Sequence, residues 1–466
     1  MEGDECSFPP DSSDDHSQRG SVASSAALSH SQDVLVYLFG DSAVHLSVEG
    51  LSSVTVQELG RLVREALRVP ESAQDAFAFW LSSPLLEVQL KARHHPYKVC
   101  RQWQDLLYRF TDASEEDISQ DEPCLQYRRN VFFRKSKELQ IEDEGVLRLL
   151  YEEAKSNVIT GRYPCDPEHW ASLGALTLAL DEGTGLDRQK LTSTMREKKL
   201  ASLVPAHVAA GGGGLFSTLR GKSGRQAGLE RDLLEEYVKI GDSRRHSEIL
   251  QRYLGTCHSL PYYGCAFFDG EIDKPAQGIL QRLKRKAVSV CISLEGVYVM
   301  DVKEKHVLLG LRFSELSWDH SYPEEESDSH ILWLEFDGDE DGTPVNKLLK
   351  IYSKQAELMS GFIEFCVELK SVSEGGAAAE TDGDAGLSQQ ASGKDGGGDE
   401  NGRRRMLRRQ SSVVCSRVRS LHTINYVDNG KEIKCFKPKR AASFFTRQAS
   451  APVYSSVQAA ESLEQG

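Results

Sequence analysis

The first patterned stretch of the chain is an apolar run followed by alternation, and it then changes to the period of a helix. Residues 34–39 are a continuous apolar run and residues 44–48 alternate with a period of two, which predicts two strands joined by a turn. After Thr55, which is suited to an N-cap, apolar residues recur at helical spacing, and alternation returns over residues 77–90. Two strands, a helix and further strands are the order of a ubiquitin-like roll, which we place at residues 33–110.

The middle of the chain, residues 111–258, has the period of helices. Its clearest feature is a corner between two helices. The two apolar faces are Val146, Leu150, Ala154 and Val158, then Trp170, Leu173, Leu176, Thr177 and Leu180. Gly161 is suited to a left-handed residue after the first helix, and we expect the Asp166 side chain to cap the second helix before Pro167. Residues 204–228 hold four consecutive glycines and predict a mobile loop within this helical region.

Residues 259–371 return to a period of two and end in one amphipathic helix. Alternation predicts strands at residues 288–294, 297–301, 307–311, 331–336 and 348–352. The helix, residues 354–370, has its apolar side at Leu358, Phe362, Phe365, Cys366 and Leu369. Antiparallel strands closed by one helix are typical of a PH/PTB-like barrel. Phe267, Phe268, Trp318 and Trp333 read as barrel core, with an aromatic ligand cage as the alternative.

Both ends of the chain lack the large apolar side chains that a core needs, and we expect them to be disordered. These segments are a polar leader (1–32), a Gly/Ser-rich linker (372–402) and a basic tail (403–466). Between Arg403 and Arg447 the tail carries 13 Lys and Arg against 2 acidic residues, whereas the whole chain is at −14. The opposite charges of the basic tail and the acidic remainder of the chain predict that the tail rests on the body or on an anionic surface.

Composition narrows the class of protein. The 466 residues are 39% hydrophobic and 27% charged, enough for two to four domains. A net charge of 56 − 70 = −14 argues against general nucleic-acid binding. The 10 cysteines are scattered without a CxxC pair, which favours a reduced compartment over a disulfide scaffold. No apolar run approaches the roughly 18 residues of a membrane span.

Two motifs resemble parts of FERM domains. The corner Gly161-Arg162-Tyr163-Pro164-Cys165, followed by an Ala/Leu-rich helix, resembles the FERM middle lobe. Tyr262-Tyr263-Gly264 and the Trp before a polar loop resemble the third lobe. The chain is identified as a member of the FERM family over residues 34–371. The resemblance implies an α+β, multi-lobe cloverleaf of a ubiquitin-like roll, an acyl-CoA-binding-protein-like helical bundle and a PH/PTB-like barrel.

The resemblance also implies a function. FERM proteins are non-enzymatic adaptors of the cytoplasm and the cytosolic face of the plasma membrane, and they bind cytoplasmic tails of transmembrane proteins. The Ser/Gly linker and short basic tail are similar to those of one member, for which the resemblance implies binding to iRhom tails. The iRhoms escort a cell-surface sheddase, and a further implied role is modulation of a Wnt co-receptor. The alternative is a peripheral protein that binds phosphoinositides through the third lobe and the basic tail. No cofactor is implied.

Three sets of residues are candidates for binding or modification. In a PH/PTB-like lobe, a strand beside the last helix can accept a peptide strand. This predicts a partner groove at Val307, Leu309, Leu311, Lys354, Glu357 and Glu364. Lys284, Arg285 and Lys286 precede a strand and are candidates for anionic lipid. Ser411, Ser443 and Ser450 each follow an Arg by three residues, as basophilic kinases require, and Ser450 with Pro452 resembles a 14-3-3 docking motif.

Other motifs favour structural interpretations. Gly221-Lys222-Ser223 lacks the glycine that a phosphate loop needs five residues earlier, where Phe216 stands. His94-His95, Cys100 and His169 match no zinc spacing. Cys257-His258 are sequence neighbours and rarely point at one another as a nucleophile and base would. We therefore expect neither a metal site nor catalysis.

Overall fold

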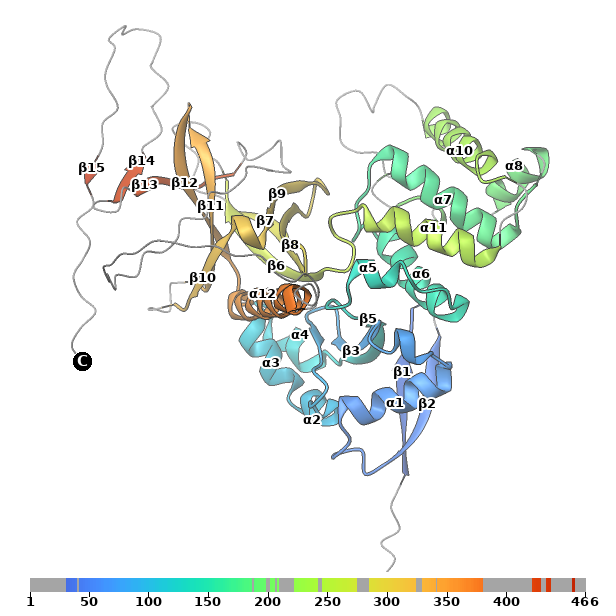
Figure 1. Ribbon diagram of the computed structural model, residues 1–466, viewed down its shortest axis with the longest axis horizontal. Coiled ribbons are helices and arrows are strands. Elements are labelled where there is room, and N and C mark those ends of the chain that lie inside the picture. The colour runs from blue at the N-terminus through green and yellow to red at the C-terminus, as the bar shows by residue number, and fades with distance from the viewer. Residues whose placement is uncertain are drawn as a thin grey trace, which may run out of the picture.

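The computed structural model describes residues 31–39, 42–186, 188–197, 202–205, 208, 222–241, 245–274, 285–323, 329–340, 342–379, 421–428, 433–436 and 455–456. Figure 1 shows three lobes that meet around the short helix α5 (Lys135–Glu138). One continuous core runs through lobes 1 and 2, and a second core fills lobe 3. No helix among these residues is long and apolar enough to cross a bilayer.

Lobe 1 is a five-stranded sheet covered by one helix. Its elements are β1 (Ser31–Tyr37), β2 (Ala43–Glu49), α1 (Val56–Leu67), η1 (Glu71–Ala73), β3 (Phe77–Ser82), β4 (Glu87–Gln89) and β5 (Cys124–Arg129), with strand order β2-β1-β5-β3-β4. Thr55 caps α1 in a capping box with Glu58, as predicted. Strand β5 pairs with β1 in parallel and with β3 antiparallel, which is the ubiquitin-like arrangement.

The predicted limits of lobe 1 were wrong at both ends. The first strand begins at Ser31, inside the predicted leader. The central strand β5 lies beyond residue 110, after α2 (Pro96–Arg101), α3 (Trp103–Phe110) and α4 (Glu115–Gln120). The hydrophobic pattern did not reveal β5. Arg128 and Arg129 are charged residue types that usually lie at the surface, yet both are buried in this strand.

Lobe 2 is a helical bundle. It consists of α6 (Glu144–Ile159), α7 (Pro167–Glu182), α8 (Arg188–Glu197), α10 (Lys222–Val238) and α11 (His246–His258). Gly161 has a φ of 71°, as a left-handed residue after α6 requires. Asp166 is the N-cap of α7, but its side chain makes no capping hydrogen bond, contrary to our prediction. The predicted loop 204–228 is also too long, because α10 already begins at Lys222; residues 209–221 lie outside the described part.

One glycine sets the spacing inside lobe 2. A Cβ on Gly174 of α7 would lie 2.6 Å from Leu233 Cδ2 and 2.7 Å from the Leu203 carbonyl oxygen. Helix α10 can therefore pack closely on α7 only because residue 174 has no side chain. The rings of Tyr151 and Tyr253 meet edge to face at 4.8 Å and join α6 to α11.

Lobe 3 is a barrel of antiparallel strands closed by one helix. It contains β6 (Ala266–Asp273), β7 (Arg285–Ser293), β8 (Gly296–Asp301), β9 (Val307–Arg312), η3 (Phe313–Glu315), β10 (Ser317–Ser321), β11 (Ile331–Glu340), β12 (Thr343–Tyr352) and α12 (Ala356–Ala379). The buried stripe of α12 is Ala356, Met359, Ile363 and Cys366, each fully inaccessible. Leu358, Phe362 and Phe365 of the predicted stripe are only half-buried. Helix α12 therefore has a second apolar face outside the barrel.

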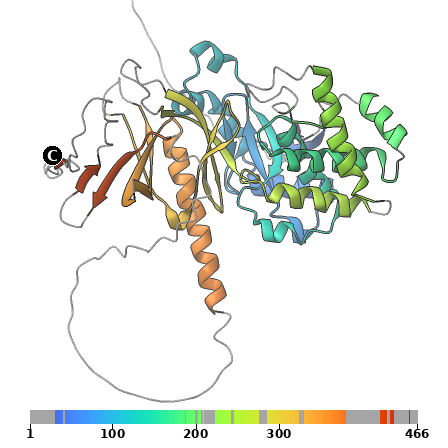
Figure 2. The same ribbon diagram turned by 90° about the horizontal axis from the view of Figure 1, so that it is seen from above.

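The segment after residue 371 also departs from prediction. Helix α12 runs on to Ala379, into the predicted linker, and Figure 2 shows its last turns extending beyond the body. The tail contributes β13 (Ile424–Asp428), β14 (Ile433–Phe436) and β15 (Ser455–Ser456) to the sheet of lobe 3, where β13 pairs with β12. These parts of the tail are thus not disordered. Their alternating sequence around Asn429-Gly430 is a strong hairpin signal that our interpretation missed.

Candidate functional site

A buried cluster of charges fixes the lobes to one another. The Arg129 guanidinium of β5 donates to the Glu138 carboxylate of α5 at 2.7 Å, and both side chains are at most 5% exposed. His258 Nε2 lies 2.9 Å from Glu138 Oε1, and the Tyr263 hydroxyl donates to the same oxygen. Burial alone would raise the pKa of Glu138, but Arg129 and these hydrogen bonds lower it to about 2. The cluster joins lobe 1, α5 and the segment between lobes 2 and 3.

The Tyr-Tyr-Gly motif has a physical role in this cluster. Tyr263 supplies the hydroxyl that bonds Glu138, and its ring lies 5.0 Å from the Arg129 guanidinium. Gly264 has a φ of 74°, and a Cβ there would lie 2.5 Å from Arg129 Nη1. Residue 264 must therefore be glycine for both its backbone conformation and its lack of a side chain.

A second charge cluster joins lobe 1 to the corner of lobe 2. Arg162, in the corner motif, donates to Glu87 of β4 at 2.8 Å, and Arg128 donates to the same carboxylate at 3.2 Å. Burial would raise the pKa of Glu87, but the two guanidinium groups lower it to about 2. Glu153 of α6 accepts a hydrogen bond from the Arg129 backbone N–H at 2.6 Å. The FERM-like corner is therefore a contact surface for lobe 1.

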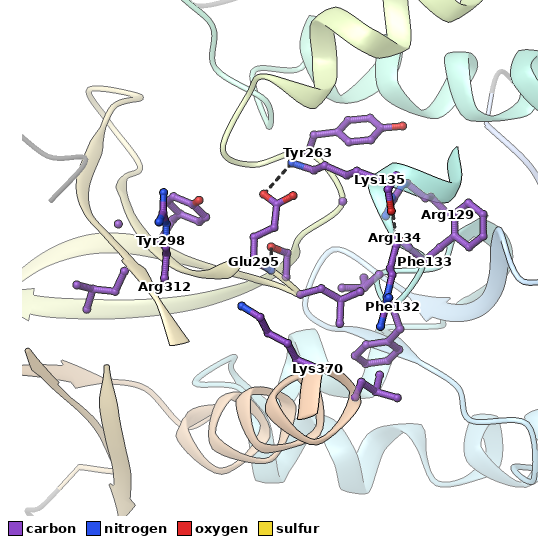
Figure 3. A pocket seen from close by; sticks show the side chains of 18 of the residues that line it. Arg129, Phe132, Phe133, Arg134, Lys135, Tyr263, Glu295, Tyr298, Arg312 and Lys370 are labelled. Atoms are coloured by element: carbon purple, nitrogen blue, oxygen red, sulfur yellow. Dashed lines mark hydrogen bonds and ion pairs between the residues drawn. The ribbon is translucent and has the colours of Figure 1, made fainter. Parts of the chain in front are cut away.

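A pocket of about 750 Å³, lined by both charged and apolar side chains, opens where the three lobes meet (Figure 3). Lys135 Nζ donates to Glu295 at 3.0 Å and to the His258 carbonyl at 3.2 Å, which joins α5 to the β7–β8 hairpin. Arg134 and Arg312 are exposed at its rim. Lys135, its buried neighbour Arg129 and the hairpin carboxylate are thus engaged in holding the lobes together.

A larger and more apolar hollow, of about 1020 Å³, lies between lobe 1 and the outer face of α12; we call it the lobe 1–lobe 3 groove. Its walls include Phe132, Phe267, Leu358, Phe362, Glu364 and Phe365, with His320 and Tyr322 at the end of β10. Phe132 stacks on Phe362 at 4.9 Å and meets Phe365 edge to face at 4.7 Å. These half-buried rings give the groove an apolar floor that is open to solvent.

Polar contacts close one end of this groove. The Arg109 guanidinium of α3 donates to both carboxylate oxygens of Glu357, and Lys354 Nζ donates to the Thr111 carbonyl oxygen at 2.8 Å. Lys354 and Glu357 were predicted to contact a partner protein, yet both form hydrogen bonds with residues of lobe 1. Glu364 lines the groove and is exposed. Our prediction did not place lobe 1 beside the helix, and this is why it missed Phe132.

The predicted strand of the groove was also wrong. Leu309 and Leu311 are buried in the core of lobe 3, and Val307 is half-buried. Helix α12 packs against β10, β11 and β7, whereas β9 forms the edge beyond β8. Strand β10 pairs with β11 among the described residues and also packs against α12.

The remaining candidates have structural partners or lie outside the described part of the chain. Arg285 stacks over the Tyr352 ring at 3.7 Å, and Lys286 pairs with the buried Asp301. Lys284, Ser411, Ser443 and Ser450 lie outside the described residues. Cys257 is buried, and burial raises the pKa of its thiol. The described residues hold no group of three potential metal ligands.

The aromatic candidates do not form a cage. Phe268 belongs to the barrel core, but Phe267, Trp318 and Trp333 are half-buried. Phe267 lies against Tyr163 and Arg162 of the lobe 2 corner, and Trp333 lies beside Lys350.

Two family models and several curated relatives match the chain. Residues 136–268 match the FERM central domain, and residues 286–362 match the KRIT1/FRMD8 FERM domain C-lobe. The chain is 67% identical to FERM domain-containing protein 8 of Danio rerio and 52% identical to that of Homo sapiens, with 100% of each chain covered. It is 16% identical to the FERM and C-terminal domain complex of Drosophila Merlin, covering 75% of this chain and 99% of that one, with a TM-score of 0.48.

The chain therefore belongs to the FERM domain family, in the group of FERM domain-containing protein 8. The predicted family and the multi-lobe α+β fold class are confirmed. FERM proteins of this kind act as adaptors that bind other proteins.

Proposed function

We propose that this protein is a non-enzymatic adaptor that binds the cytoplasmic tail of a membrane protein in the lobe 1–lobe 3 groove. The observation that carries the proposal is the apolar groove itself, where half-buried aromatic rings from two lobes stay open to solvent. An amphipathic peptide segment can bind by laying its apolar face into a hydrophobic groove of this kind. The helix face and the exposed Glu364 give an incoming segment both apolar and polar contacts.

The family resemblance of the sequence suggests the partner. The cytoplasmic tails of iRhoms are the first candidates, because the Ser/Gly linker and the short basic tail resemble those of a FERM protein for which such binding is implied. Binding there would support the cell-surface stability of the iRhom–sheddase complex from the cytosolic face of the plasma membrane. The tail of a Wnt co-receptor is a second candidate, and a 14-3-3 protein is a candidate reader of phosphorylated Ser450.

One glycine permits a sharp test of the groove. Gly361 lies on the exposed face of α12, and a Cβ there would have no neighbour within 4 Å. Gly361→Trp should fill the groove without disturbing the barrel, and the lost glycine should favour the helix slightly. The matched control is Gly255→Trp, at a helical glycine of α11 whose Cβ would also have no neighbour within 4 Å.

The measurement is calorimetric titration of an iRhom cytoplasmic tail into the native protein and the two variants. We expect Gly361→Trp to weaken binding at least tenfold, which is about 1.4 kcal/mol. Gly255→Trp should bind as the native protein does. Equal affinity for all three proteins would place the tail outside the groove.

The second candidate function is binding to anionic phosphoinositides. It is favoured by the 13 basic residues between Arg403 and Arg447, which oppose an otherwise acidic chain. Sedimentation with vesicles that contain or lack acidic lipid tests it. If the protein sediments with acidic vesicles at low salt but not at high salt, lipid binding is supported. If it does not sediment with acidic vesicles at either salt concentration, this candidate function is excluded.

A further inference from the structure

The lobe 1 wall of the groove continues into a basic stretch of chain. Residues 88–104 run from β4 through α2 into α3 and contain four Lys or Arg and two His, but no Asp or Glu. The whole chain has more acidic than basic residues, 70 against 56, so this stretch is opposite in charge to the chain that contains it. We call its four Lys and Arg residues, Lys91, Arg93, Lys98 and Arg101, the basic strip.

The charged groups of the basic strip are available to a partner. All four residues are exposed. Among the residues that the structure describes, none of the four forms a hydrogen bond or an ion pair through its side chain. Lys98 and Arg101 are three residues apart on α2 and therefore lie on the same face of that helix. The strip thus differs from Arg109, Arg128 and Arg162, which are already paired with carboxylates.

The basic strip makes one end of the groove positive. Lys91 and His94 both line the groove. Burial lowers the pKa of the His94 imidazole, and the positive charges of Lys91 and Arg93 lower it further. A negatively charged group of a ligand is therefore attracted to this end of the groove.

Lys91 connects this positive charge to the apolar floor of the groove. Its Nζ lies 5.3 Å from the centre of the Phe365 ring. A carboxylate that pairs with Lys91 would therefore lie next to apolar side chains bound against Phe362 and Phe365. The opposite wall, formed by α12, carries Glu357 and Glu364, so the two walls differ in charge. Acidic groups of a ligand are favoured on the lobe 1 side and disfavoured on the α12 side.

We propose that the partner segment in the groove is apolar where it contacts α12 and is followed by Asp and Glu residues that lie along the basic strip. This inference rests on the groove being the partner site, as proposed above. The acidic residue nearest the apolar part pairs with Lys91, and the next ones pair with the rest of the strip. A protein segment suits the site better than an anionic membrane does, because a flat surface cannot fill a hollow of about 1020 Å³ and would be repelled by Glu364.

The probe is a library of displayed random peptides, selected on the full chain. Peptides that bind the native protein but not Gly361→Trp are defined as groove ligands, because that substitution fills the groove. We expect the groove ligands to share an apolar segment that is flanked on one side by Asp and Glu. Calorimetric titration of one such peptide then measures what the strip contributes.

The strip variant carries both Arg93→Glu and Lys98→Glu. We expect it to bind the selected peptide at least tenfold more weakly than the native chain at low salt, with a smaller difference at high salt. The matched control carries Arg148→Glu on α6 and Lys303→Glu in the β8–β9 turn, which are exposed basic residues of the other two lobes. It has the same net charge as the strip variant and should bind as the native chain does.

Charge exchange separates direct pairing from an indirect structural effect. A peptide whose Asp and Glu are replaced by Lys should bind the native chain at least tenfold more weakly than the original peptide does. The same peptide should bind the strip variant more tightly than it binds the native chain, because its Lys residues meet the new carboxylates. A variant that was merely misfolded would bind neither peptide.

The outcomes distinguish this inference from the proposed function. If selection yields no peptide that Gly361→Trp excludes, the groove is not a partner site and both proposals are overturned. Groove ligands without flanking acidic residues, or equal affinity for the strip variant and its control, would overturn this inference alone. If the strip variant loses sedimentation with acidic vesicles while its peptide affinity is unchanged, the strip is a membrane surface and the acidic partner is wrong.

Discussion

The Arg129 guanidinium and the Glu138 carboxylate meet at 2.7 Å, buried at the point where the three lobes come together. Removing either partner leaves the other as an uncompensated buried charge, which costs more than the pair itself contributes. Because His258 and Tyr263 bind the same carboxylate, this pair links lobe 1 to the segment between lobes 2 and 3.

The first prediction follows from that dependence. Glu138→Gln should lower the free energy of unfolding by about 3–5 kcal/mol. Denaturant titration followed by circular dichroism measures it. Glu65→Gln, in an exposed pair with Arg61, is the control and should stay within about 0.5 kcal/mol of the native protein. Similar losses in both variants would show that the buried pair has no special role.

The second prediction concerns pH. The pKa of Glu138 falls from its ordinary 4.5 to about 2, so folding favours its ionised form. Its contribution is therefore present above about pH 4.5 and is lost as the pH falls toward 2. At about 1.4 kcal/mol per pKa unit, the loss is on the order of 3 kcal/mol. Unfolding measured between pH 5 and pH 2.5 should show this decline, and Glu138→Gln should show a shallower one. Equal slopes would contradict the assignment.

The third prediction separates backbone strain from a steric clash. Gly264→Ala should cost about 1–3 kcal/mol, because φ is 74° and the new methyl meets Arg129 at 2.5 Å. Gly241→Ala has a φ of 79° but open space around its Cβ, so only the strain of about 1 kcal/mol remains. Thermal unfolding of the two variants measures the difference. A Gly264→Ala loss no larger than that of Gly241→Ala would show that Arg129 moves away freely.

The fourth prediction compares the two kinds of contact between lobes 1 and 3. Phe132→Ala removes a ring that packs on both Phe362 and Phe365 and should cost about 3 kcal/mol. Arg109→Ala removes an ion pair whose Arg side chain is 59% exposed and should cost less than about 1 kcal/mol. Denaturant unfolding should rank the variants in that order, and the reverse ranking would make the ion pair the main contact.

Local patterns predicted most of the elements. The helix corner at Gly161 and the strands β7 and β8 rest on sequence-adjacent residues, and all three were predicted correctly. Strand β5 could not be found by hydrophobic alternation, because Arg128 and Arg129 are buried by ion pairs with Glu87 and Glu138, which belong to other elements. The Asn429-Gly430 signal was present in the tail but was outweighed by the basic composition around it.

The site depends on information that no local pattern contains. Lys354 and Glu357 lie on the predicted helix, but only the position of lobe 1 shows that both are occupied. No sequence motif marks Phe132 as a site residue. Its role arises because it packs on α12 where lobes 1 and 3 meet. The strand beside α12 was misassigned because the barrel order, which follows from long-range pairing, places β10 there.

The most direct test of the adaptor account is site-specific cross-linking in the lobe 1–lobe 3 groove. A photoreactive amino acid at position 364 should cross-link to a bound iRhom cytoplasmic tail, because Glu364 lines the groove and is exposed. The same group at Val238, which is 72% exposed on α10 of lobe 2, is the control and should give no product. Cross-linking from position 238 with none from position 364, at a saturating tail concentration, would contradict the account.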